Sequence, residues 1–106
     1  LGNNAEAEAE LRDVLKNPQF SSEAIGHLST ALLYQGKFDE CEALIQEALD
    51  RGIVHLSLHV NAGTLYFEKK DFQKSRLHWV EAIKLNPEDS FLSEALKKTD
   101  SALKMA

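Results

Sequence analysis

The stretch from Leu56 to Pro87 constrains this chain most, because its small and bulky residues recur at the spacings that two paired helices require. Ala62, Gly63 and Tyr66 fall on one helical face, since residues three and four apart are neighbours on a helix. A glycine inside a helix costs roughly 1 kcal/mol relative to alanine, so Gly63 indicates that another backbone approaches closely. The approaching helix would begin near residue 72, and its facing side carries Ser75, Trp79, Ala82 and Ile83. The stretch therefore predicts a tightly packed helix pair, which a proline ends.

The same spacing of small and bulky residues begins 34 residues earlier, at Ser22. Identical residues stand at this offset in four places: Thr30 and Thr64, Phe38 and Phe72, Glu47 and Glu81, Ala48 and Ala82. Most positions of the predicted helix pair keep their size class in the earlier copy, which has Leu28, Ser29, Leu32, Cys41 and Ile45 where the later copy has Ala62, Gly63, Tyr66, Ser75 and Trp79. Gly36 is placed to end the first helix in a left-handed conformation. The sequence thus predicts a second helix pair in front of the first.

The helical spacing of apolar residues and the 34-residue repeat predict an all-α chain of about six antiparallel helices. The helices are expected near 5–16, 22–35, 39–51, 56–69, 72–85 and 90–104. We expect one domain over residues 1–106, made of a half repeat (1–18), two repeats (22–55 and 56–89) and a capping helix (90–106). The last helix can alternatively be the first helix of a further repeat. Because the chain opens at Leu1 inside a repeat, we expect it to be an excised piece of a longer protein.

Composition excludes several classes of function. The net charge of −5 over 106 residues is mixed along the chain, which argues against a nucleic-acid module. No apolar run is long enough to cross a membrane, so no membrane insertion is expected. Cys41 is the single cysteine and stands where a small buried residue is wanted, so neither a disulfide within the chain nor a reactive thiol is expected. No secretory signal is visible, and the compartment stays unassigned, with the cytoplasm slightly favoured.

No set of residues predicts catalysis. His55 and His59 lie four apart, as in many zinc sites, but no carboxylate or thiol ligand stands at a useful spacing around them. The sequence also has no glycine-rich phosphate loop, no Ser-His-Asp arrangement and no carboxylate pair in an apolar setting. We therefore expect no enzyme activity, no metal and no cofactor.

The order of these residues resembles the tetratricopeptide repeat (TPR) pattern. Gly63, Tyr66, Trp79, Ala82 and Pro87 match it, whereas His59, Ala62 and Ser75 replace the usual Trp, Leu and Ala. The resemblance implies a right-handed α-α superhelix, a TPR-like solenoid in which the first helix of each pair lines a concave side.

By the same resemblance, the chain is expected to be a non-catalytic adaptor or scaffold that binds a peptide or helix of another protein in this concave groove. The groove offsets of the family fall on His27, Thr30, Tyr34, Ser57, Asn61, Thr64, Phe67 and Glu68. Asn61 would serve the backbone amides of a peptide, and Tyr34 and Phe67 would offer flat apolar area. Alternatively, these two rings pack between helices.

One subfamily holds a C-terminal carboxylate with a clamp of Lys, Asn and Arg residues. Only Asn61 matches that clamp, because the other clamp positions hold Gly26, Thr30, Phe91 and Ala95. A carboxylate clamp is therefore not expected. The remaining alternative function is a structural spacer or self-association segment of a longer repeat protein. Weak self-association is expected in either case, because the missing partner of the first helix would leave one side uncovered.

Overall fold

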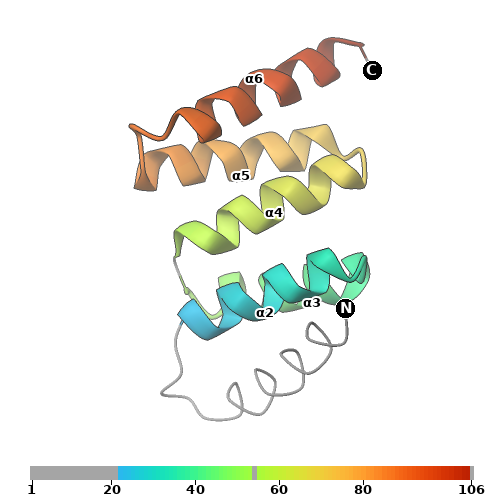
Figure 1. Ribbon diagram of the computed structural model, residues 1–106, viewed down its shortest axis with the longest axis vertical. Coiled ribbons are helices and arrows are strands. Elements are labelled where there is room, and N and C mark those ends of the chain that lie inside the picture. The colour runs from blue at the N-terminus through green and yellow to red at the C-terminus, as the bar shows by residue number, and fades with distance from the viewer. Residues whose placement is uncertain (1–21, 54, 106) are drawn as a thin grey trace.

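The computed structural model describes residues 22–53 and 55–105, and all of their regular structure is helical. The helices are α2 (Ser22–Tyr34), α3 (Phe38–Asp50), α4 (Leu56–Glu68), α5 (Phe72–Leu85) and α6 (Ser90–Met105) (Figure 1). The corresponding five predicted helices are confirmed, with every end within one residue of its expected place. The helix expected over 5–16 lies outside the described residues, so the predicted number of six stays a prediction.

The turns after α2 and α4, which are equivalent in the two helix pairs, share one geometry, although different residues make them. After α2, Gly36 adopts a left-handed φ of 74°, and the Lys37 N–H donates to Leu32 O at 2.9 Å. After α4, Lys70 adopts the same conformation with φ of 64°, and the Asp71 N–H donates to Tyr66 O at 2.8 Å. The left-handed conformation has a steric cost for a residue with a Cβ, whereas glycine adopts it without that cost. The equivalent turns therefore differ in strain.

The other two connections differ from each other. Gly52 ends α3 with a left-handed φ of 78°, and the Ile53 N–H donates to Ala48 O at 3.0 Å. After α5, Asn86 leaves the helical conformation with φ −145° and ψ 74°, and a turn at residues 87–88 leads into α6. The non-helical conformation of Asn86 follows from the proline behind it, because the residue before a proline resists helical geometry. The sequence difference between Ile53 and Pro87 thus changes how the chain leaves each pair.

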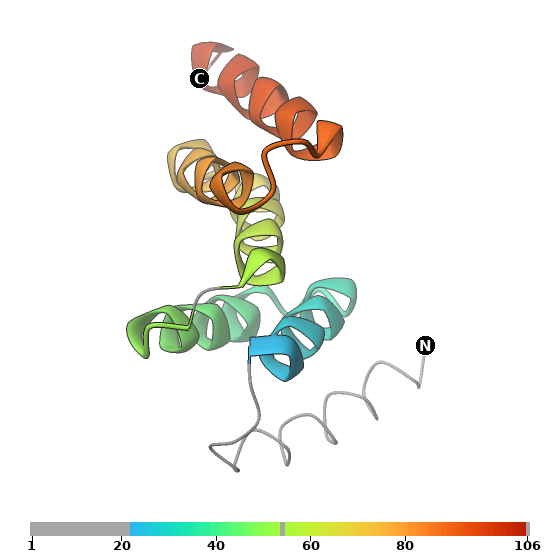
Figure 2. The same cartoon turned by 90° about the vertical axis from the view of Figure 1, so that its left-hand side faces the viewer.

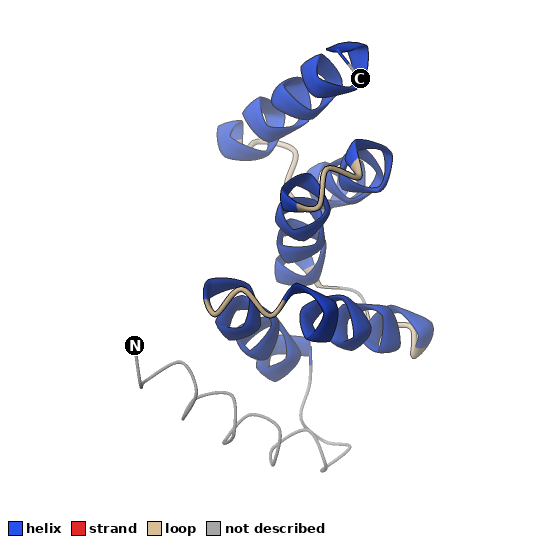
Figure 3. Ribbon diagram, turned by 90° about the vertical axis from the view of Figure 1, so that its right-hand side faces the viewer, coloured by secondary structure: helices blue, strands red, loops and turns tan. Residues whose placement is uncertain are grey.

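The helices stack along the long axis of the molecule, and consecutive helices run antiparallel (Figures 1 and 2). Each helix contacts the next one in the chain, and α2 also packs against α4. The connections between them are short (Figure 3). None of the described helices is long and apolar enough to cross a membrane.

The core is divided into two clusters. The larger one joins α2, α3 and α4, with fully buried Leu28, Leu32, Leu58 and Leu65 among its members. The smaller one joins α5 and α6 through Trp79, Ala82 and Leu92, with Leu56 and Val60 of α4 packed against it. Because α4 contributes to both clusters, it lies at the centre of the described fold.

The same inter-helix hydrogen bond occurs in both helix pairs. The Ser75 hydroxyl donates to Gly63 O at 2.7 Å, and the Cys41 thiol donates to Ser29 O at 3.4 Å. Burial raises the pKa of Cys41 to about 11, so the thiol stays protonated and can donate. The expectation that Cys41 is a small buried residue is confirmed. The two pairs therefore share a backbone contact at the 34-residue offset that the sequence shows.

Candidate functional site

Two neighbouring hollows follow α4 on one side of the stack. The first, here called the α2/α4 hollow, has a volume of about 340 Å³. The second, the α4/α6 hollow, has a volume of about 490 Å³. Thr64 and Glu68 line both, so the two hollows lie next to each other along α4, and together they are here called the groove. The first is lined by Thr30, Leu33, Tyr34, Phe38, Val60, Asn61, Thr64 and Glu68, and the second by Thr64, Phe67, Glu68, Trp79, Phe91, Glu94, Ala95 and Lys98.

The groove brings together most of the residues that the sequence assigned to binding. Thr30, Tyr34, Asn61, Thr64, Phe67 and Glu68 all line it. His27 is exposed on α2 and lines neither hollow, and Ser57 lies at the opposite end of α4 from Glu68. The Ser57 hydroxyl is within 2.7 Å of His55 Nδ1, which also accepts from the Ser57 N–H and caps the helix. Ser57 therefore helps to begin α4.

Asn61 has a structural role that the sequence did not predict. Its side chain is 9% exposed, and its amide nitrogen lies 3.2 Å from Gly26 O, 2.7 Å from Ser29 Oγ and 3.0 Å from Thr30 Oγ1. The two hydroxyls in turn donate to Gly26 O. The two N–H groups of Asn61 are therefore used between α4 and α2, and its contact with a bound peptide stays a prediction.

Glycine makes that contact between α2 and α4 possible. A Cβ at Gly26 would collide with the Ser57 hydroxyl, so the two helices approach more closely than larger residues would allow. The close approach brings Asn61 within reach of the α2 backbone. The floor of the α2/α4 hollow is thus a hydrogen-bonded seam, and its exposed aromatic group is Tyr34, which is 77% exposed.

The two aromatic residues expected in the groove differ in their environment. Tyr34 extends into solvent, which excludes the alternative that it packs between helices. Phe67 is partly buried, and its ring meets Phe72 edge-on at a centroid distance of 5.2 Å. Phe67 therefore both lines the α4/α6 hollow and supports the contact between α4 and α5.

Trp79 lines the α4/α6 hollow from α5. Its side chain is 4% exposed, and its fused ring lies so close to Gly63 that a Cβ there would come within 2.6–2.9 Å of three ring atoms. The indole Nε1 is buried and has no hydrogen-bond partner among the described residues. Phe91, 59% exposed at the start of α6, meets the indole edge-on at a centroid distance of 6.2 Å. This end of the groove therefore has aromatic side chains from three helices, with charged residues beside them.

Sequence reasoning missed the contribution of α6 to the groove. Phe91, Glu94, Ala95 and Lys98 all line the α4/α6 hollow. The sequence predicts residues 90–106 as a capping helix, and the groove residues that it predicts all lie in the two repeats. A signal was available, because Phe91 and Ala95 already stood at clamp positions.

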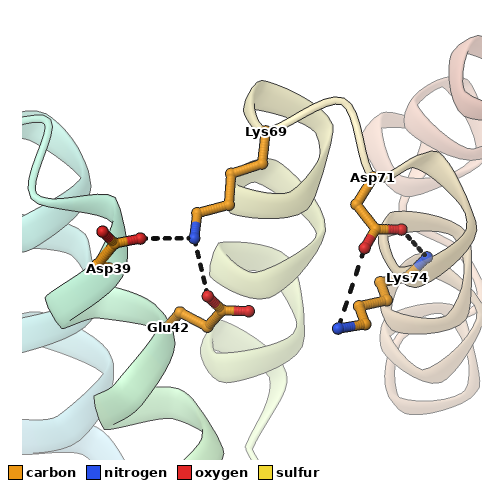
Figure 4. A network of polar contacts seen from close by, with 5 residues as sticks. All are labelled: Asp39, Glu42, Lys69, Asp71 and Lys74. Carbon is orange, nitrogen blue, oxygen red and sulfur yellow. Dashed lines mark hydrogen bonds and ion pairs between the residues drawn. The ribbon is translucent and has the colours of Figure 1, made fainter.

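A charged network ties α4 to α3 outside both hollows (Figure 4). Lys69 Nζ lies 2.9 Å from Asp39 Oδ1 and 2.8 Å from Glu42 Oε1. Hydrogen bonding to Lys69 lowers the pKa of both carboxyl groups. Burial, with a further contribution from the hydrogen bond to Glu42, raises the pKa of Tyr66 to about 12. Lys69, which follows Glu68 in the sequence, thus forms its ion pairs with α3.

Two histidines meet between α4 and α5. His59 Nδ1 and His78 Nδ1 are 3.1 Å apart, so one ring donates and the other accepts. Burial lowers the pKa of both, and that of His78 falls from 6.5 to about 4 with a further contribution from His59. His55 lies apart from them as the cap of α4. The described residues hold no group of three or more ligands that could bind a metal ion.

Comparison with known proteins adds one partial match. No family model matches the chain, and no solved structure matches it. A 70-residue part, 66% of the chain, is 33% identical to U-box domain-containing protein 70 from Oryza sativa subsp. japonica. The matched part spans 8% of that protein. The match therefore concerns a small segment of the U-box protein, and it gives no evidence that this chain shares that protein's activity.

Proposed function

We propose that this chain is a TPR-like part of a right-handed helical array and that its groove holds a segment of a partner protein without catalysing a reaction. The observation that carries the proposal is that the two hollows are adjacent along α4. Because Thr64 and Glu68 line both hollows, an extended chain or a helix lying along α4 can contact α2 and α6 at the same time.

The recurrence of contacts between the helix pairs supports the repeat part of the proposal. The bonds from Ser75 to Gly63 O and from Cys41 to Ser29 O join equivalent positions. The packing of α2 against α4 places the first helices of the two pairs side by side, as stacked repeats require. In such an array, the groove on the side of the first helices is the extended surface available to a partner.

The exposure of aromatic rings supports the binding part. Tyr34 and Phe91 stand in different hollows with 77% and 59% of their surface exposed. Rigid aromatic side chains provide large contact area at a low entropic cost and are enriched at binding surfaces. A spacer would have no use for exposed rings at both ends of one groove.

Site-specific crosslinking tests the proposal. A photoreactive phenylalanine replaces Tyr34 in one variant and Leu77 in a matched control, because Leu77 is 63% exposed on α5 and lines neither hollow. In an extract of the source cells, we expect the Tyr34 variant to crosslink one or a few defined proteins, and an excess of the unmodified chain to compete. Crosslinking from Leu77 alone would place the binding surface elsewhere. Crosslinks only between copies of the chain would favour a self-association segment.

A further inference from the structure

The α4/α6 hollow has the properties of an anchoring pocket for one large apolar side chain. Its volume of about 490 Å³ lies within the range of small-ligand sites, roughly 300–1,000 Å³. Phe67, Trp79, Phe91 and Ala95 supply apolar lining from three helices. A flexible polar side chain would gain little from these apolar groups, whereas a bulky apolar one would bury part of its surface against them.

Trp79 supplies the largest of the aromatic rings that line this hollow. Its N–H is buried without an acceptor in the part of the chain that the structure describes. Native proteins pair almost all such groups, because an unpaired buried donor loses its bonds to water without replacement.

The charges around the hollow determine what should accompany the apolar side chain. Glu94 has two lysines on its own helix: Lys97, at 3.8 Å, and Lys98, at the favourable spacing of four residues. Glu68, on α4, has no ion-pair partner among the described residues, because Lys69 is held by α3. Among the described carboxylates that line the groove, the one without an ion pair is therefore Glu68, at the point where the two hollows meet, and Lys98 is the cation of the same lining.

We propose that the α4/α6 hollow binds a partner segment in which a large apolar side chain, such as Phe, enters the hollow and an adjacent Lys or Arg pairs with Glu68. This inference rests on the proposed function and specifies the chemistry of the partner. The apolar side chain provides most of the affinity, and the basic one provides the preference for sequence.

Three synthetic peptides with a common Gly-Ser framework test the chemistry directly. One carries Phe-Arg, the second Phe-Glu and the third Ser-Arg. Trp79 is the only tryptophan of the chain, so its fluorescence and its single indole N–H resonance report on the hollow without a label. We expect the Phe-Arg peptide to shift both signals saturably. The Ser-Arg peptide should bind at least about tenfold more weakly, which corresponds to the loss of a buried aromatic side chain.

Glu68→Gln tests the basic residue. The substitution keeps the size of the side chain and removes its charge, and we expect it to weaken the Phe-Arg peptide about two- to fivefold, as for an exposed ion pair. The Glu68→Gln variant should bind the Phe-Glu peptide with an unchanged or higher affinity. Glu88→Gln is the matched control, because Glu88 is exposed, lies in the turn before α6 and lines neither hollow. It should leave all three peptides unchanged.

The outcomes separate this inference from the proposed function. Equal binding of the Phe-Arg and Phe-Glu peptides, or equal effects of the two glutamine substitutions, would overturn the role of Glu68. If none of the peptides shifts the Trp79 signals, the inferred occupant is wrong. Should crosslinking from Tyr34 still identify a partner in that case, the groove remains the binding surface with another ligand chemistry. Failure of both experiments would refute the proposed function as well.

Discussion

Gly63→Ala should destabilise this protein, although alanine is the better helix former. Gly63 lies in the middle of α4, opposite the fused ring of Trp79, and a Cβ there would be 2.6–2.9 Å from three ring atoms. Contacts this short require a side chain or a helix to move. The ring cannot move easily, because Trp79 is 4% exposed and packs with Ala82 and Leu92. The methyl group therefore overpacks the contact between α4 and α5.

The two opposing effects can be compared. Replacing a mid-helix glycine by alanine gains about 1 kcal/mol in helix propensity. Overpacking a well-packed core costs about 1–3 kcal/mol. We expect a net loss of about 1 kcal/mol in the free energy of unfolding, measured by urea denaturation followed by circular dichroism.

A double-mutant cycle isolates the contact. The preceding helix pair has Ser29 and Ile45 at the positions of Gly63 and Trp79, so a side chain with a Cβ is compatible with an isoleucine opposite it. In a Trp79→Ile background, Gly63→Ala should therefore become stabilising by about 1 kcal/mol, which corresponds to a coupling of about 2 kcal/mol. If Gly63→Ala stabilises the wild type, or if the coupling is absent, the close approach at Gly63 does not contribute to the free energy of unfolding.

Three further predictions follow from other contacts. Asn61→Ala should lower the free energy of unfolding by about 1–3 kcal/mol in urea denaturation, because it removes the hydrogen bonds between α4 and α2. Lys70→Gly should raise the free energy of unfolding in the same experiment by about 1 kcal/mol, since glycine adopts the left-handed φ of 64° without strain. The pKa of His78 is lower in the folded chain than the ordinary value of 6.5, so the unfolded state binds more protons, and stability should fall as the pH is lowered from about 6.5 to about 4. His78→Gln should flatten that pH dependence in a series of thermal melts.

Each of these predictions has a control within the chain. Gly36→Ala, at the position equivalent to Lys70, should destabilise where Lys70→Gly stabilises. Glu81 raises the pKa of both His59 and His78 in the folded chain, so a Glu81→Gln variant should make the loss of stability on acidification larger and extend it to a lower pH. An unchanged melt of Asn61→Ala would mean that its bonds to α2 are replaced by water at no cost.

The positions of the described helices were predictable because short-range effects set them. The three- and four-residue spacing of apolar positions, the glycine at 36 and the proline at 87 act within a few residues of where they stand. Asp71 begins α5 for the same kind of reason, because its carboxylate accepts from the Lys74 N–H at 3.3 Å. The close helix contact at Gly63 was also predictable, because a glycine in a helix has a cost that needs a reason.

The chemistry of the groove depended on tertiary packing. From sequence, Asn61 could serve either a ligand or a neighbouring helix, and only the close approach at Gly26 directs its amide to α2. His59 met His78 on another helix, not the histidine four residues before it. Which side chains share a hollow depends on how far helices slide and turn against each other. Side-chain volumes from several helices decide this together, so no spacing along one segment encodes it.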